Sequence, residues 1–167
     1  MKNHYSLLLI NEIINHLNET KIFIKIDIKN TYYQICICKN DKCKTVFWTQ
    51  YELYEYLIMS FELINVLTIF QSYIHKVLHK HLKMFMIVFL NDILIYFKNK
   101  ISYQQHVCMI LKALLETKLY IKLVKCQFSV RKIFFIRFVI TDQDMKIKEE
   151  HINTVINWSE SESIFEI

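Results

Sequence analysis

The chain has 167 residues, a formal net charge of +5 and 53% hydrophobic residues. This length and apolar content suit one folded domain with a sizeable core and exclude a disordered chain. No apolar run approaches the roughly 20 residues of a membrane helix, and the N-terminus shows no signal-peptide core. The sequence therefore predicts an intracellular protein without a membrane partner. Its scattered lysines permit a polyanionic partner but do not require one.

Glycine and proline are both absent from the chain. Average usage would supply roughly 12 glycines and 8 prolines at this length. Every turn must therefore form without the residues that best tolerate positive φ or preset φ. An absence this complete indicates that one process has acted on the whole composition.

The first half of the chain predicts one helix, several strands and a second, longer helix. Apolar residues at helical spacing predict the first helix over residues 5–18. Strict alternation of isoleucine with other residues predicts a strand over 21–29, with Asp27 near its end. The remaining elements of this half are strands over 32–38, 44–49 and 53–58 and a helix over 61–81.

The second half opens with two short apolar runs, which the polar pair Asn91-Asp92 separates. Short runs rich in Ile, Val, Phe and Tyr are typical of buried strands, and Asx residues favour turns. The sequence thus predicts a β-hairpin over 84–97. Two interpretations of the pair are open: a simple turn, or a carboxylate site raised on a rigid hairpin and aimed at a metal ion. The later elements are a helix over 102–117, extended segments over 119–123 and 125–128, a strand over 133–140, a turn over 142–145 and a helix over 148–158.

This order of elements predicts an α+β fold, with a mainly antiparallel sheet and helices packed on one face. No repeat or linker divides the chain, so a single domain over residues 1–167 is expected. Arg137 interrupts the apolar run of the strand over 133–140. A charge inside a buried strand would be unfavourable.

Five blocks of the sequence are collinear with a known family. They are KIDIKNTYYQI, KTVFWTQYELYEYLIMSFELINVLTIFQ, VFLNDILIYF, HVCMILKALLETKLYIKLVKCQF and FFIRFVI. Together they resemble the reverse transcriptase of gypsy-type long-terminal-repeat retrotransposons, from about residue 5 to residue 158. The resemblance implies a polymerase palm with part of the fingers. The N-terminal fingers segment would precede residue 1, and the thumb and ribonuclease H domain would follow residue 167.

The resemblance also implies the catalytic positions. In this family one aspartate at a strand end and two in a hairpin turn hold two Mg²⁺ ions, which prefer oxygen ligands. Asp27, Asn91 and Asp92 stand at these positions here. Ile28 would offer its backbone carbonyl to a metal ion. The implied reaction is nucleotidyl transfer from a dNTP to a primer 3′-hydroxyl.

Two aromatic residues match substrate-binding positions of the family. Tyr32 matches the gate that excludes a ribose 2′-hydroxyl, and Phe61 matches the segment that packs on the nucleotide and template. The implied partners are an RNA template, a DNA primer, a dNTP and the rest of a polyprotein.

Asn91 is the departure with the largest consequence, because the family has an aspartate there. An amide is neutral, offers one oxygen and cannot bridge two cations. Losing several kcal/mol of metal stabilisation corresponds to roughly three or more powers of ten in rate. The sequence therefore predicts a pseudoenzyme. Two alternatives stay open: a palm remnant that binds nucleic acid without catalysis, and an unselected open reading frame without function.

The other departures share one signature. Changes of Pro to Ser or Leu, Gly to Glu or Arg, Ala to Val or Thr, Arg to Trp or Gln and Asp to Asn are each reachable by a C-to-T change on one DNA strand or the other. We hypothesise that a retroelement copy riddled with such transitions encodes the chain. Codons without an excess of these transitions over related copies would contradict this. Because Glu52, Glu62 and Lys118 occupy family glycine positions, backbone strain and marginal stability are expected.

Overall fold

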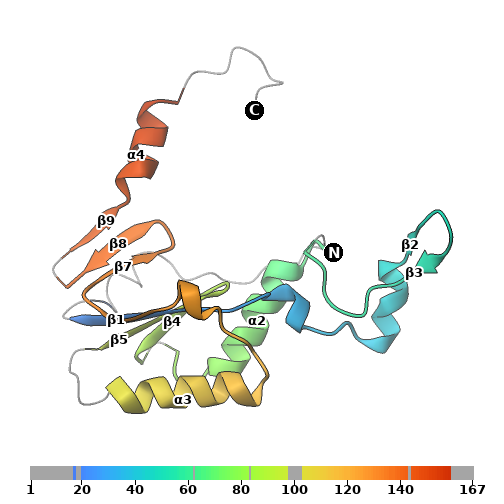
Figure 1. The fold of residues 1–167 in the computed structure, drawn as a ribbon, viewed down its shortest axis with the longest axis horizontal. Helices are drawn as coiled ribbons and strands as arrows, with labels where there is room; N and C mark the ends of the chain where they lie inside the picture. Colours follow the sequence, from blue (N-terminus) through green and yellow to red (C-terminus); the bar gives the residue numbers. More distant parts are fainter. Residues whose placement is uncertain are drawn as a thin grey trace.

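A four-stranded antiparallel sheet forms the centre of the molecule (Figure 1). The computed structural model describes residues 17, 20–61, 63–82, 84–97, 103–142 and 144–158. The helix predicted over 5–18 lies, apart from Leu17, outside these residues. The strand order is β4-β5-β1-β6. The bounds are Ile22–Asp27 for β1, Met86–Phe89 for β4, Asp92–Phe97 for β5 and Gln127–Val130 for β6.

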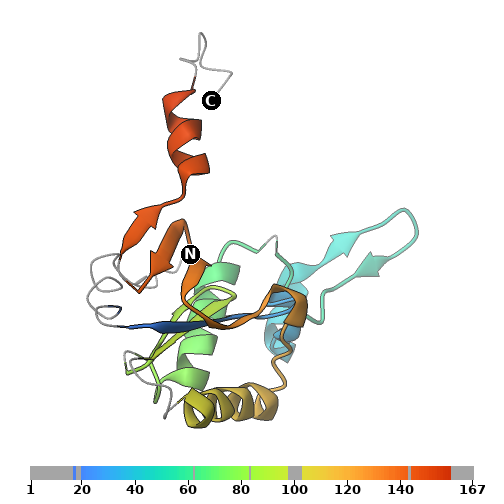
Figure 2. The same cartoon turned by 60° about the vertical axis from the view of Figure 1, so that its left-hand side comes forward.

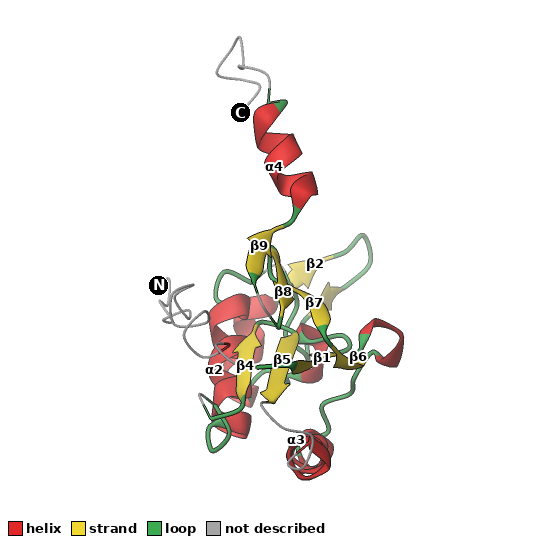
Figure 3. Ribbon diagram, turned by 90° about the vertical axis from the view of Figure 1, so that its left-hand side faces the viewer, coloured by secondary structure: helices red, strands yellow, loops and turns green. Residues whose placement is uncertain are grey.

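Two helices cover one face of this sheet (Figure 3). They are α2 (Val66–Leu78) and α3 (Tyr103–Glu116). Because side chains alternate across a strand, every second residue of β1 points toward these helices. The resulting core includes Ile24, Ile26, Ile93 and Ile95 from the sheet and Phe70, Ile74, Ile110 and Leu114 from the helices, all at most 2% exposed. The predicted α+β fold with helices on one face of an antiparallel sheet is confirmed.

The opposite face of the sheet carries a second, smaller core. A three-stranded sheet of β7 (Lys132–Phe135), β8 (Phe138–Thr141) and β9 (Met145–Ile147) packs there. Buried residues of this core include Phe23 of β1 and Leu94 of β5. Helix α4 (Glu149–Ile156) follows β9 and extends away from the body (Figure 1). No helix among the described residues is long and apolar enough to cross a membrane.

The segment between β1 and α2 contains less strand than predicted. Residues 32–34 and 39–45 form 3₁₀ helices. An isolated antiparallel bridge joins Cys36 to Ile58. Beyond it, β2 (Phe47–Trp48) and β3 (Leu53–Tyr54) pair as a short hairpin. This hairpin projects from the rest of the chain (Figure 2). The β-propensity of a residue mostly reflects how its side chain packs on a half-buried sheet. The residues of β2 and β3 are exposed, so their favourable side chains do not lengthen these strands beyond two residues each. Helix α2 likewise begins at Val66, not at residue 61.

The prediction of one strand over 133–140 was wrong. Phe135 pairs with Phe138, so the chain reverses through a two-residue turn at Ile136 and Arg137. Arg137 is exposed in this turn, which avoids the cost of burying its charge. Among the expected glycine positions, Lys118 has a φ of 57°, whereas Glu52 is not among the described residues with positive φ. Glu62 lies outside the described residues.

The core beside α3 predicts a loss of stability in mild acid. The His106 ring stacks on Phe85 with centroids 3.8 Å apart, and its Nδ1 is buried without a hydrogen-bond partner among the described residues. Burial, together with His81, lowers the pKa of His106, and burial lowers the pKa of His75. In the unfolded chain these histidines bind protons near pH 6.5, whereas in the folded chain they bind them only at a lower pH. The free energy of unfolding is therefore at its full value above pH 6.5 and decreases as the pH falls below 6.5.

Urea unfolding at pH 7.5 and pH 5.5 tests this prediction. The midpoint is expected to fall at the lower pH, and His106→Phe should reduce that fall because phenylalanine takes up no proton. An identical pH dependence in the variant and the unaltered chain would show that His106 does not contribute.

Candidate active site

The ends of two neighbouring strands bring the predicted carboxylates together. Asp27 ends β1 and Asp92 begins β5, and the antiparallel register places them directly opposite each other on one face. Asn91 lies in the two-residue turn before Asp92, and its backbone carbonyl accepts a hydrogen bond from the Ile28 N–H at 2.9 Å. The β4–β5 turn is therefore tied directly to the end of β1.

An open cleft of about 430 Å³ lies beside these strand ends. Five of the six predicted site residues line it, and the sixth, Asp92, does not. The five are Asp27, Ile28, Tyr32, Phe61 and Asn91. Segments that are more than 60 residues apart in the sequence thus converge on one cavity.

One wall of the cleft is aromatic. The Tyr32 ring makes edge contacts with Phe61 at 5.2 Å and with Phe70 at 5.7 Å between centroids. Phe70 is fully buried on α2, whereas Phe61 is 59% exposed. Burial raises the pKa of the Tyr32 hydroxyl, which keeps it protonated at neutral pH. The buried helix therefore anchors a tyrosine that faces the cavity.

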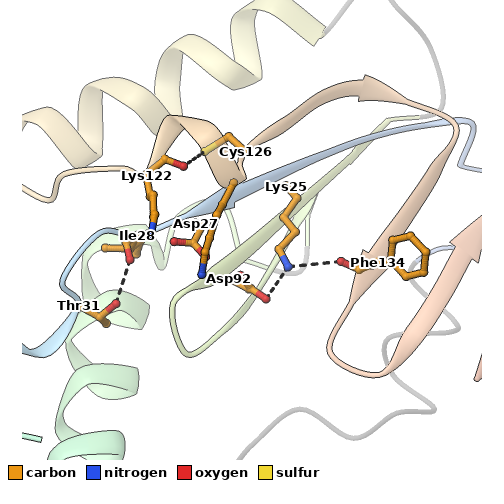
Figure 4. A network of polar contacts seen from close by, with 9 residues as sticks. Lys25, Asp27, Ile28, Thr31, Asp92, Lys122, Cys126 and Phe134 are labelled. Carbon is orange, nitrogen blue, oxygen red and sulfur yellow. Dashed lines mark hydrogen bonds and ion pairs between the residues drawn. The ribbon is translucent and has the colours of Figure 1, made fainter. Parts of the chain in front are cut away.

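Each carboxylate of the site is paired with a lysine. Lys25 Nζ lies 2.8 Å from Asp92 Oδ2 and donates a hydrogen bond to the Phe134 carbonyl at 3.4 Å (Figure 4). Lys125 Nζ lies 3.8 Å from Asp27 Oδ2. Sequence reasoning missed both lysines. Lys25 could have been found, because residues two apart on a strand share a face, but nothing local points to Lys125.

The donor set does not fit a pair of Mg²⁺ ions. Magnesium is usually held by carboxylates together with phosphates and water, yet the two carboxylates here are ion-paired and the third position is an amide. The Ile28 carbonyl, the predicted backbone ligand, accepts a hydrogen bond from the Thr31 hydroxyl at 3.0 Å. In the part of the chain that the structure describes, no three His, Cys, Asp or Glu side chains are grouped to hold a metal.

The cleft favours anionic ligands instead. Three lysines, Lys29, Lys122 and Lys125, line it against a single carboxylate, Asp27. Like charges gathered around a cavity focus the local potential and attract phosphate groups. The backbone holds Lys122 in place, since its N–H donates to the Asp27 carbonyl at 2.8 Å.

The sequence and the fold both have known counterparts. The chain is 28% identical over 158 residues to the Tf2-3 and Tf2-7 transposon polyproteins of Schizosaccharomyces pombe, which covers 95% of the chain but 12% of each polyprotein. The fold matches the foamy viral protease-reverse transcriptase in complex with an RNA/DNA hybrid, with a TM-score of 0.80 and 17% identity over 96% of this chain and 22% of that one. A second structure of that enzyme, with double-stranded DNA, gives a TM-score of 0.82 at 17% identity over 99% of this chain and 29% of that one.

The family follows from the match over nearly the whole chain. Residues 1–159 match the model of the family described as reverse transcriptase (RNA-dependent DNA polymerase). The chain belongs to the reverse transcriptase family.

Proposed function

We propose that this chain is the palm, with part of the fingers, of a retrotransposon RNA-directed DNA polymerase that no longer catalyses nucleotidyl transfer. The observation that carries the proposal is the cleft, because it gathers Asp27, Ile28, Tyr32, Phe61 and Asn91 in one cavity. The expected partners are an RNA template, a DNA primer and a dNTP. A gypsy-type element, with a thumb and a ribonuclease H domain elsewhere in the polyprotein, remains the expected source.

The residues of the cleft suit binding better than chemistry. Lys29 and Lys122 would attract the phosphates of a nucleotide or primer. Tyr32 would stand beside the sugar and exclude a 2′-hydroxyl, and Phe61 offers an exposed ring to a base. In active members of the family, two Mg²⁺ ions supply the charge that stabilises the transferred phosphoryl group. The donor set here falls short of holding them.

Asn91 is proposed as the main cause of that loss. It occupies the turn beside Asp27, where a carboxylate would add a negative charge and a second oxygen. Asp92 is held by Lys25 on the side toward β7 and does not line the cleft. Only one carboxylate, Asp27, therefore faces the cavity among its lining residues.

The alternative of a binding palm remnant is favoured by one specific observation, the three lysines of the cleft. An unselected open reading frame without function predicts no such retained binding. Affinity for a primer–template therefore distinguishes these two.

We expect salt-sensitive binding of an RNA template annealed to a DNA primer, without Mg²⁺-dependent extension of that primer. Each lost phosphate contact should flatten the plot of log affinity against log salt by about 0.7 to 0.9. Lys29→Gln with Lys122→Gln should therefore reduce the slope by about 1 to 2. Fluorescence anisotropy between 50 and 200 mM salt would measure it.

The matched control is Lys76→Gln, which removes an exposed lysine of α2 that does not line the cleft. The control should keep most of the original slope. Binding that does not respond to salt, or that both variants weaken equally, would remove the cleft as the nucleic-acid site.

A further inference from the structure

Gln71 is a buried polar residue on the helix that covers the main sheet. It is 2% exposed and stands among the apolar residues that α2 turns toward β4. Burying an amide is unfavourable unless its polar atoms are hydrogen-bonded. Its partners therefore show why this core contains a glutamine.

The Gln71 amide binds the β4–β5 hairpin at both of its polar atoms. Oε1 accepts a hydrogen bond from the Leu90 N–H at 2.7 Å, and Nε2 donates to the Val88 carbonyl at 3.1 Å. Val88 belongs to β4 and Leu90 is the first residue of the turn. The amide also lies 2.6 Å from His75 Nε2, one helical turn along α2. One side chain therefore spans the point at which the strand enters the turn.

The turn needs such support because of its backbone conformation. Leu90 has a φ of 53°, the left-handed region, in a chain that contains no glycine. Phe89 pairs with Asp92, so Leu90 and Asn91 form a two-residue loop whose first position favours glycine when φ is positive. The Leu90 N–H finds its partner in Gln71 instead of in the strand ladder. Gln71 thus stabilises the positive φ of Leu90, because it accepts the hydrogen bond of the Leu90 N–H, which points toward α2 in this conformation.

We propose that Gln71 is a positioning residue, which holds the β4–β5 turn so that residue 91 faces the cleft beside Asp27. The turn is then held from two sides, by Gln71 at Leu90 and by the Ile28 N–H at the Asn91 carbonyl. The preceding residue of α2, Phe70, contacts Tyr32 on the aromatic wall. Adjacent residues of one helix therefore set two walls of the same cavity.

Amide hydrogen exchange tests the hydrogen bond directly. In the unaltered chain the Leu90 amide should exchange slowly, although it lies in a turn. Gln71→Leu keeps a side chain of similar size and removes both hydrogen bonds to the hairpin together with the contact to His75. It should speed exchange at Leu90 at least tenfold relative to the amide of Ile95 in β5. Gln71→Glu retains an acceptor for the Leu90 N–H and should restore part of the protection.

Gln104→Leu is the matched control, since it makes the same chemical change at an exposed position of α3. It should leave exchange at Leu90 unchanged. Fast exchange at Leu90 in the unaltered chain would overturn the proposal, and this result does not depend on whether any variant folds. Equal rates at Leu90 in Gln71→Leu and the unaltered chain would overturn it as well.

The consequence for catalysis rests on the proposed function and is measured separately. In the Asn91→Asp background, Gln71→Leu should lower kcat at least tenfold and change the KM for dNTP less than threefold. The substitution would misplace the carboxylate at position 91 but keep the residues that contact the substrate in place. Equal losses with Gln104→Leu would contradict a positioning role. An inactive Asn91→Asp chain would count against the proposed function, while exchange at Leu90 would still decide the role of Gln71.

Discussion

Replacing Phe70 by alanine is expected to lower the free energy of unfolding by about 3–5 kcal/mol. The Phe70 side chain is fully buried between α2 and the main sheet, and its ring also contacts Tyr32. Truncation removes the transfer free energy of the ring and leaves a cavity that a packed core closes only in part. Since small domains are stable by about 5–15 kcal/mol, much of the total is at stake. Urea denaturation followed by circular dichroism would measure the change.

Leu67→Ala is the control, because Leu67 lies on the same helix and is 46% exposed. It should cost no more than about 1 kcal/mol, since nearly half of its surface already meets water. Equal destabilisation by the two substitutions would contradict the packing of α2 on the sheet described above.

The central sheet and its helices could be predicted because their signals are local. Alternating isoleucines in β1 indicate a strand, and the two apolar runs around Asn91-Asp92 do so because they are short and rich in Ile, Val, Phe and Tyr. The spacing of Phe70, Ile74 and Leu78 likewise indicates a helix with one buried face. Such patterns predict which side chains are buried, and in the structure these three helix residues and most apolar residues of the strands are buried.

The segment between β1 and α2 and the β7–β8 hairpin could not be predicted in the same way. Residues 32–38 have suitable side chains for a strand, yet the structure begins them with a 3₁₀ turn. In the described chain their only strand-like pairing is a short antiparallel bridge between Cys36 and Ile58, which is not enough to form a strand over the whole segment. At Arg137 the apolar pattern concealed a reversal, since a two-residue turn without glycine or proline leaves no compositional signal.

The candidate site was predicted by resemblance, but the contacts that tune it were not. Asp27 and Asn91 follow from motif positions in the sequence. The Lys25–Phe134 and Gln71–Leu90 hydrogen bonds join residues 109 and 19 positions apart. Such pairings exist only after the sheets and helices have packed, so neither periodicity nor spacing reveals them.

Replacing Asn91 by aspartate is expected to raise Mg²⁺-dependent primer extension by about three powers of ten or more over the unaltered chain. The variant would place a second carboxylate in the cleft beside Asp27. Two carboxylates in the cleft give a divalent cation the charged oxygen ligands that it requires. The cation would then compete with Lys125 for Asp27. A gain of about 4 kcal/mol in transition-state stabilisation corresponds to a thousandfold rate.

Asp27→Asn in the Asn91→Asp background is the control. It again leaves one carboxylate in the cleft and should return extension to the background. If the double variant kept the activity of Asn91→Asp, the gain would come from something other than a paired carboxylate site.

The most direct test is primer extension on an RNA template with Mg²⁺, run side by side on the unaltered chain and on Asn91→Asp. We expect extended product from Asn91→Asp alone, and none when Mg²⁺ is left out. Extension by the unaltered chain at a comparable rate would contradict the role assigned to Asn91. Extension by neither protein would place the loss of activity elsewhere than at residue 91.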